Sequence, residues 1–238
     1  MLQASSPVAL LRHSDFRTVL DDIWVEHLDL DVTPEVTTAA QHVLEHARST
    51  ASNLKTGVIQ TQGQFRLSGA VNTSQKVLVD LVAARLCDVG LLPAHSEEAM
   101  LRVSGLMAMR GAQPHTDGGY GHWRDSMFWS LCLEDTDTDV LFGNLRVRIP
   151  QQRGTLLAFD PCQPHAVLAR EQELFMKSHF SKGRQQFFVG GDFVPKSWAQ
   201  LGVVHNLSKA QTSGRIDIVA TLVDQKTCLM KVSGRYGT

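Results

Sequence analysis

Apolar residues recur with a helical period in the first third of the chain, so several helices are expected there. The first covers residues 15–27, whose apolar side chains share one face. The second runs from Pro34 to about Arg48, because Thr33 is a favoured N-cap residue and Pro suits the first helical position. The third covers residues 74–87. These helices form a layer that can bury one apolar face against another element.

From Met100 onward the pattern changes to short apolar segments separated by turn residues. Such spacing is typical of a β-sandwich or barrel. Two short strands are also expected between the second and third helices, over residues 57–63 and 65–67. Near the end of the chain, residues 215–222 and 227–232 are expected to form a hairpin.

Length and composition favour one domain. The 238 residues are 43% hydrophobic, which is enough for a sizeable buried core. We expect residues 1–95 to be a mostly helical support region and residues 96–238 to be a β core that ends in the hairpin. The predicted fold class is therefore α+β with a mainly β core, braced by N-terminal helices.

Charge and targeting signals disfavour some functions. The net charge is −1 with acidic and basic residues interspersed, so no basic stripe favours nucleic acid as a partner. The N-terminus has no secretory pattern and the chain has no run of 18 apolar residues. The four cysteines are scattered, without a C-x-x-C pair. These features favour a cytoplasmic protein with reduced thiols and no membrane partner, and they leave the oligomeric state open.

The strongest chemical signal is the triplet His115-Thr116-Asp117, followed by a distant histidine, His165. In an extended chain, residues i and i+2 point to the same side, so His115 and Asp117 can bind one ion together. His165 stands at the start of an apolar strand that follows a Pro-containing turn. Two histidines and one carboxylate on one face of a metal form the facial triad of non-haem Fe(II) oxygenases. These three residues are the predicted metal ligands.

The segment from Leu101 to His165 resembles the double-stranded β-helix core of the 2-oxoglutarate/Fe(II) oxygenases, in particular the prolyl-4-hydroxylase-like branch. The resemblance rests on an apolar strand at residues 101–110 and a Gly before H-x-D, an acidic turn at residues 134–139, and a Gly-x-Leu-x-x-Phe-like strand at residues 154–159. It extends to about residue 192. It implies a jelly-roll or cupin-like barrel with Fe(II) as the metal, 2-oxoglutarate as the cosubstrate and O2 as the oxidant.

The resemblance also implies a basic residue that holds the far carboxylate of 2-oxoglutarate. Arg184 and Gln186 belong to a segment similar to the family's strand after the distal histidine. Arginine suits this role because its planar guanidinium binds a carboxylate through two hydrogen bonds. Arg184 lies nineteen positions after His165, whereas the family's basic residue usually lies about ten after it, so residues 171–182 would be an inserted loop. Lys177 and Arg170 are the competing candidates.

The implied reaction is hydroxylation of an unactivated C–H bond in a small molecule or an amino-acid or protein side chain, with succinate and CO2 as coproducts. Desaturation or ring closure would use the same site. No catalytic residue is expected beyond the metal ligands, because the metal and the cosubstrate carry the chemistry. Residues near H-x-D are candidates to line a substrate pocket: Arg110, Tyr120, His122 and Trp123.

Two alternatives remain from the sequence. The first is a non-catalytic β-barrel that binds metal as a sensor or binding module. The second is a zinc metallopeptidase, since His42-Val-Leu-Glu45-His46 matches H-x-x-E-H and places both histidines on one helical face. Val43 and Leu44 already belong to the apolar stripe of that helix, so a scaffold role is the competing interpretation of the motif.

Overall fold

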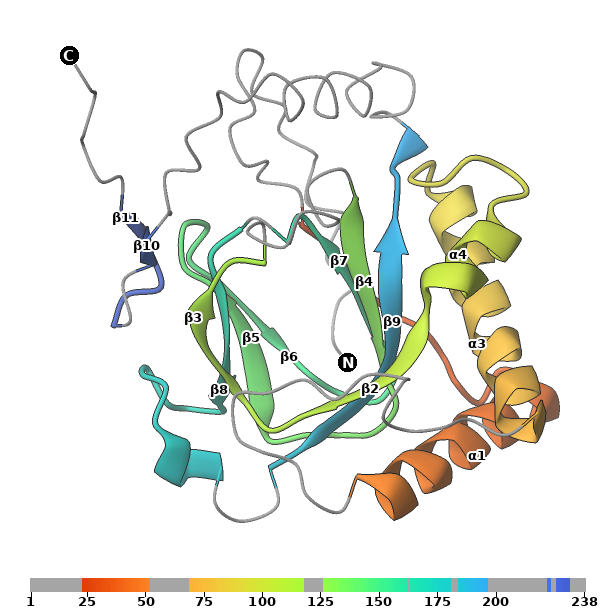
Figure 1. The fold of residues 1–238 in the computed structure, drawn as a ribbon, viewed down its shortest axis with the longest axis horizontal. Coiled ribbons are helices and arrows are strands. Elements are labelled where there is room, and N and C mark those ends of the chain that lie inside the picture. The colour runs from red at the N-terminus through yellow and green to blue at the C-terminus, as the bar shows by residue number, and fades with distance from the viewer. Residues whose placement is uncertain are drawn as a thin grey trace.

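Two antiparallel β-sheets face each other at the centre of this computed structural model, and helices cover the outer side of the larger sheet (Figure 1). The structure describes residues 23–51, 69–117, 126–161, 163–180, 184–196, 222–223 and 226–231. The strands predicted over residues 57–63 and 65–67 lie outside these ranges.

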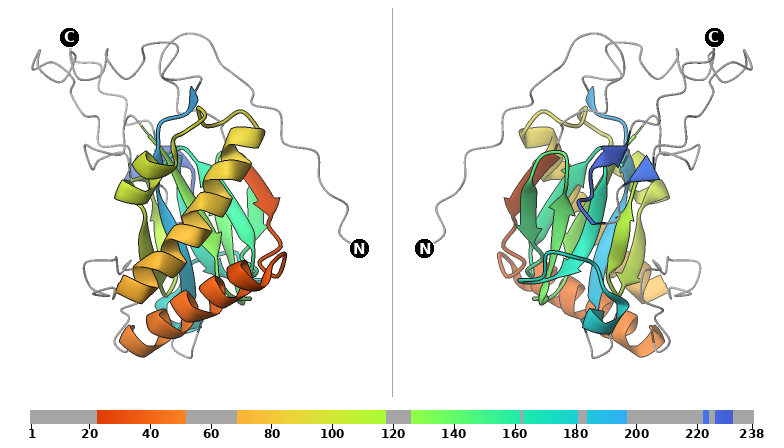
Figure 2. Two further views of the ribbon diagram at one scale, coloured as in Figure 1. Left: turned by 90° about the vertical axis from the view of Figure 1, so that its right-hand side faces the viewer. Right: turned by 90° about the vertical axis from the view of Figure 1, so that its left-hand side faces the viewer.

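The helices follow the predicted pattern closely. Helix α1 spans Pro34–Thr50, and the Thr33 side chain accepts a hydrogen bond from the Val36 backbone N–H at 3.2 Å, as an N-cap should. Helix α3 spans Gly69–Asp88, five residues longer at its start than expected. The two helices pack across one face of the larger sheet (Figure 2).

The first predicted helix is wrong where it can be compared. Ile23–His27 forms strand β1, which pairs antiparallel with β7 (Thr155–Phe159). A segment of five residues with the β-branched Ile23 and Val25 is too short for its pattern to distinguish a helix from a strand. A strand forms because β7 offers an unpaired edge, which no local pattern reveals.

A second difference precedes the metal motif. The sequence predicted a strand from Leu101 to Arg110, but Glu97–Val103 forms helix α4 and strand β2 covers only Gly105–Met109. Two glutamates in the first turn of α4 favour its helical start.

The larger sheet has the order β1-β7-β4-β9-β2, and the smaller has the order β3-β8-β5-β6. The remaining strands are β3 Ala112–His115, β4 Met127–Cys132, β5 Thr138–Phe142, β6 Val147–Pro150, β8 His165–Ala169 and β9 Gln186–Phe193.

This order is that of a double-stranded β-helix. The eight strands from β2 to β9 form the barrel. Strands β2, β9, β4 and β7 are successive neighbours in the larger sheet, and strands β3, β8, β5 and β6 are successive neighbours in the smaller sheet. Successive strands therefore alternate between the sheets except at the β5–β6 hairpin, which is a jelly-roll arrangement. The predicted fold class is confirmed. Strand β1 extends the larger sheet beyond this core.

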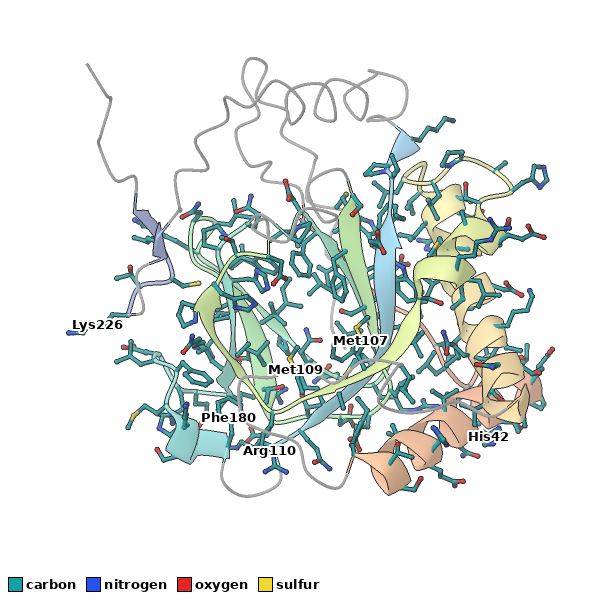
Figure 3. The ribbon with its side chains drawn as sticks, viewed as in Figure 1. His42, Met107, Met109, Arg110, Phe180 and Lys226 are labelled. Atoms are coloured by element: carbon teal, nitrogen blue, oxygen red, sulfur yellow. The ribbon has the colours of Figure 1, made fainter. Side chains whose placement is uncertain are left out.

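Side chains on the larger sheet alternate between two apolar cores. The outer face, including Trp129 and Phe187, packs against α1 and α3. The inner face, including Met107 and Phe188, packs against the smaller sheet, and Figure 3 shows Met107 and Met109 between the sheets. The space between the sheets is the barrel interior.

The terminal hairpin is confirmed where it is described. Strand β10 (Leu222–Val223) pairs with β11 (Met230–Lys231), and Cys228 between them is fully buried against Ala166 and Leu168 of β8. Residues 215–221 lie outside the described ranges. No described helix combines the length and the apolar character needed to cross a lipid bilayer.

Candidate metal centre

Strands β3 and β8 bring the two predicted histidines together. His115 ends β3 and His165 begins β8, and they are direct partners in the register of the two strands. Their rings lie with centroids 4.3 Å apart. Asp117 follows β3, and its backbone N–H donates to the Pro161 carbonyl at 2.8 Å. That bond ties the H-x-D loop to the turn before His165, so the backbone positions all three residues.

The three side chains converge on one point. Asp117 Oδ1 lies 3.5 Å from His115 Nε2, and Asp117 Oδ2 lies 3.5 Å from His165 Nε2. One ligand atom from each residue lies within 4.8 Å of the others. Two ligands bound at about 2.0–2.2 Å can be no more than about 4.4 Å apart, so small side-chain rotations would complete a metal site.

Hydrogen bonds fix the protonation pattern of both rings. His115 Nδ1 lies 2.7 Å from the Gln113 carbonyl, and His165 Nδ1 lies 2.8 Å from the Gln163 carbonyl. A carbonyl can only accept, so each Nδ1 carries a hydrogen and donates it. In the neutral rings both Nε2 atoms therefore keep their lone pairs, which face Asp117. This is the tautomer that a metal ligand needs.

The pKa values of the three side chains shift in different directions. Burial lowers the pKa of His165 to about 4, with the His115 charge acting in the same direction. Burial also disfavours the charged form of His115, but the hydrogen bond and charge of Asp117 outweigh it and raise the pKa. For Asp117, burial is outweighed by the two histidines, and its pKa falls. The carboxylate is ionised and His165 is neutral near pH 7, as metal binding requires.

Aromatic rings surround the buried histidine. Phe159 meets the His165 ring edge-on with centroids 4.9 Å apart, and Phe142 lies at 6.1 Å. His165 is only 6% exposed, whereas the side chains of His115 and Asp117 are 31% and 26% exposed. The centre is thus closed on the His165 side and open on the side of the H-x-D loop.

Arg184 lies at the other end of the barrel. Its guanidinium pairs with Asp137 at 2.8 Å and donates to the His179 carbonyl at 3.0 Å. Asp137 immediately precedes Thr138, which opposes Ala169 at the far end of β8 from His165. Four residues of strand separate these levels, about 13 Å. The structure therefore does not bring Arg184 into contact with the metal ligands. It lines an open depression of about 560 Å³ with the acidic turn.

Gln186 faces the barrel interior at the same end. Thr136 Oγ1 donates to the Gln151 carbonyl at 2.7 Å, so its bond with Thr138 Oγ1 uses the Thr138 proton. Thr138 can then only accept, and it does so from Gln186 Nε2 at 2.5 Å. This chain fixes the amide orientation and leaves the carbonyl oxygen and one N–H of Gln186 without another described contact.

The two competing basic residues lie outside the interior. Arg170 pairs with Asp139 at 3.3 Å and donates to the Thr136 carbonyl at 2.8 Å. Lys177 is exposed in the short 3-10 helix η2, Lys177–Phe180. Arg170 follows the end of β8 that is remote from His165, so its strand position is no closer to the metal centre than that of Arg184.

The predicted substrate residues have different positions. Arg110 follows β2 at the end where Met109 opposes Gln186, which is the end remote from the metal centre. Figure 3 shows it near Phe180, whose ring packs against Gly111. Its Nε is buried without a described partner. The structure thus does not bring Arg110 to the metal centre. Tyr120, His122 and Trp123 lie outside the described residues.

The rival H-x-x-E-H motif forms no comparable cluster. His42 Nδ1 lies 3.0 Å from Ser74 Oγ, so this histidine links α1 to α3. Within the described ranges, His115, Asp117 and His165 form the sole group of three or more potential metal-binding side chains. The scaffold interpretation of the motif is therefore favoured.

Among the comparisons with known proteins, only the one with solved structures finds similar proteins. No family model matches the chain, and no curated protein matches it. Structural neighbours include 2-oxoglutarate-dependent oxygenases and prolyl hydroxylases.

Three of these neighbours illustrate the likeness. A viral collagen prolyl hydroxylase from Paramecium bursaria Chlorella virus 1 is 12% identical, with 79% of this chain and 97% of that chain covered and a TM-score of 0.43. A Trichoplax adhaerens prolyl hydroxylase, solved with a hypoxia-inducible-factor peptide, is 13% identical (75% and 86% covered, TM-score 0.44). A non-haem α-ketoglutarate-dependent epimerase from nogalamycin biosynthesis is 10% identical (71% and 77% covered, TM-score 0.41). The fold assignment therefore rests on the strand order of this chain itself.

Proposed function

We propose that this protein is an Fe(II)- and 2-oxoglutarate-dependent dioxygenase that hydroxylates an unactivated C–H bond of a small molecule or an amino-acid side chain. One observation carries the proposal: His115, Asp117 and His165 offer two imidazole nitrogens and a carboxylate within 4.8 Å, at one end of a double-stranded β-helix. This donor set is the one that non-haem Fe(II) oxygenases use, and it leaves positions open for other ligands.

The chain's own residues would prepare the centre for that metal. The Gln113 and Gln163 carbonyls hold both rings with Nε2 turned toward Asp117. The carboxylate would offset part of the ion's charge, and the rings of Phe142 and Phe159 exclude water from the His165 side. With Fe(II) and 2-oxoglutarate bound, the site would couple decarboxylation of the cosubstrate to succinate with oxidation of a C–H bond by O2.

Arg184 and Gln186 are the proposed groups for the far carboxylate of 2-oxoglutarate. They stand two positions apart, so in an extended chain their side chains share a face. Gln186 keeps a hydrogen-bond donor beyond its bond to Thr138. Arg184 would have to exchange its bond with Asp137 for one with the cosubstrate, and the pair is exposed enough for such an exchange. Arg170 and Lys177 remain the alternatives.

The decisive experiment is turnover of 2-oxoglutarate. Purified protein with Fe(II), ascorbate and 2-oxoglutarate should form succinate, slowly without a substrate and faster with a metabolite extract. Asp117→Ala is the matched negative control. Metal binding without any succinate, with or without extract, would instead support the non-catalytic metal-binding module. Zinc-dependent cleavage of peptides that ignores 2-oxoglutarate would support the peptidase.

A further inference from the structure

The junction between β2 and β3 packs against the 3-10 helix η2 at the end of the barrel that is remote from the metal centre. Gly111 has a φ of +69°, and the Phe180 ring lies where its side chain would be, with one atom 2.5 Å from the position of a Cβ. Phe180 is fully buried and stacks on Phe175 with ring centroids 5.5 Å apart. These contacts hold η2 against the junction, and Figure 3 shows Arg110 beside Phe180.

Two polar side chains flank this contact. Arg110 precedes Gly111, and His179 precedes Phe180. Arg110 Nε and His179 Nδ1 are both buried without a hydrogen-bond partner. The other two guanidinium nitrogens of Arg110 also make no hydrogen bond with the part of the chain that the structure describes, but they are not buried. A ligand at the surface can therefore reach them.

The positive charge of this corner has no direct counter-charge. Within the described ranges, neither Arg110 nor Lys177, the first residue of η2, forms an ion pair. Asp137 is bonded to Arg184 at 2.8 Å, which balances the charge of that arginine. Two acidic residues of the same inserted loop are exposed and pair with neither cation: Glu171 and Glu173. Folded proteins rarely leave a partly buried donor unsatisfied, so this corner is suited to an anion.

We propose that Arg110 and His179, with Lys177, bind a small phosphate-like dianion. The two terminal nitrogens of the guanidinium match two oxygens of a tetrahedral anion. The imidazole can donate one further N–H, and the flexible ammonium of Lys177 can balance the second negative charge. A dianion is preferred to a monoanion because two cations lack a counter-charge. This site is separate from the metal centre, and the inference does not rest on the proposed oxygenase function.

Inorganic phosphate is the probe, and the metal-free full-length protein is titrated so that no bound metal ion competes for it. Isothermal titration calorimetry is done at about pH 8, where phosphate is a dianion, and at constant ionic strength. Phosphate should bind at least about tenfold more tightly than acetate, which carries one charge. Arg110→Gln should weaken phosphate binding by at least about tenfold. Arg110→Lys should weaken it less, because the charge is kept and only the two-point contact is lost.

Two control variants make the test specific. Arg102→Gln removes an exposed arginine from α4 and should leave the phosphate affinity unchanged. Asp117→Ala should also bind phosphate like the wild type, because this change lies at the other end of the barrel.

Several results would overturn the proposal: no saturable phosphate binding by the wild type, equal affinity for acetate, an unchanged affinity in folded Arg110→Gln, or an equal loss in Arg102→Gln. Displacement of phosphate by an equal concentration of 2-oxoglutarate would assign the corner to the cosubstrate and overturn a separate site. Succinate formation bears on the proposed function alone, so either proposal can fail without the other.

Discussion

The two ends of the barrel are built differently. At the metal end, three side chains from two distant segments meet with their donor atoms turned toward one another, and each histidine is held by a backbone carbonyl. At the opposite end, the polar groups are bonded to each other. Arg184 pairs with Asp137, and Gln186 starts a hydrogen-bond chain through Thr138 and Thr136.

The metal end is therefore already arranged for its ligand, whereas the Arg184 end must first give up existing hydrogen bonds. At the metal end, the side chains of His115, Asp117 and His165 would exchange their contacts with one another for stronger bonds to the metal ion. Carboxylate binding at the second end must displace Asp137 from the Arg184 guanidinium, and that competition lowers the net gain. The metal end should therefore respond to mutation in an all-or-none way, and the opposite end in a graded way.

The largest effect is expected for Asp117→Ala. The two remaining histidines lack the anionic ligand, so Fe(II) binding and succinate formation should both be abolished. The fold should persist, because the Asp117 contact with Pro161 uses the backbone N–H, which alanine keeps. Metal content by elemental analysis and the melting temperature check this. Wild-type turnover in this variant would refute the metal centre.

Arg184→Ala should have the next largest effect. Losing a hydrogen bond to a charged group costs about 1.5–3 kcal/mol, so the KM for 2-oxoglutarate should rise by roughly ten- to a hundredfold, with Fe(II) binding kept. Arg184→Lys should have a smaller effect because it keeps the charge and loses the two-point contact. An unchanged KM would move the role to Lys177 or Arg170, and no effect at either would refute the cosubstrate assignment.

Asp137→Asn tests the competition directly. If Asp137 holds the guanidinium that 2-oxoglutarate needs, removing its charge should lower the KM for 2-oxoglutarate by a few-fold. The exposed pair contributes about 0.2–1 kcal/mol, so stability should change little. Steady-state kinetics of the variant beside Arg184→Ala measures this. A KM that rises instead would mean that Asp137 orients Arg184 rather than competing for it.

The stability of the metal-free protein should fall as the pH drops from about 6.5 toward 4. The pKa of His165 is about 4 in the folded chain and near 6.5 when unfolded, so the unfolded state takes up more protons across this window. The raised pKa of His115 acts in the opposite direction, because its protonated form is favoured in the fold. Denaturant titrations of the wild type and His165→Gln at several pH values separate the contributions of the two histidines. If the free energy of unfolding depends on pH equally in both proteins, the assignment to His165 is contradicted.

The smallest effect is expected for His42→Ala and His46→Ala. His42 bonds to Ser74 between two helices, and its loss should lower stability by about 1 kcal/mol while activity stays within a few-fold of wild type. Metal content and succinate formation are the measurements. A large loss of bound metal in either variant would restore the peptidase interpretation.

The sequence by itself determined the features that local pattern encodes. Thr33 and Pro34 mark the start of α1, the spacing of apolar segments predicts the β core, and H-x-D places two candidate ligands on one side of an extended chain. The motif was sufficient to name His165 as the third candidate ligand, because the apolar strand and the turn before it gave it a context.

Only the tertiary structure decided which distant residues meet. Ile23–His27 became a strand because β7 offered an edge, Arg184 acquired Asp137 as a partner, and Arg110 took a position at the end remote from the metal. The register of the strands decides these positions, because it is set by pairing between segments far apart in the sequence.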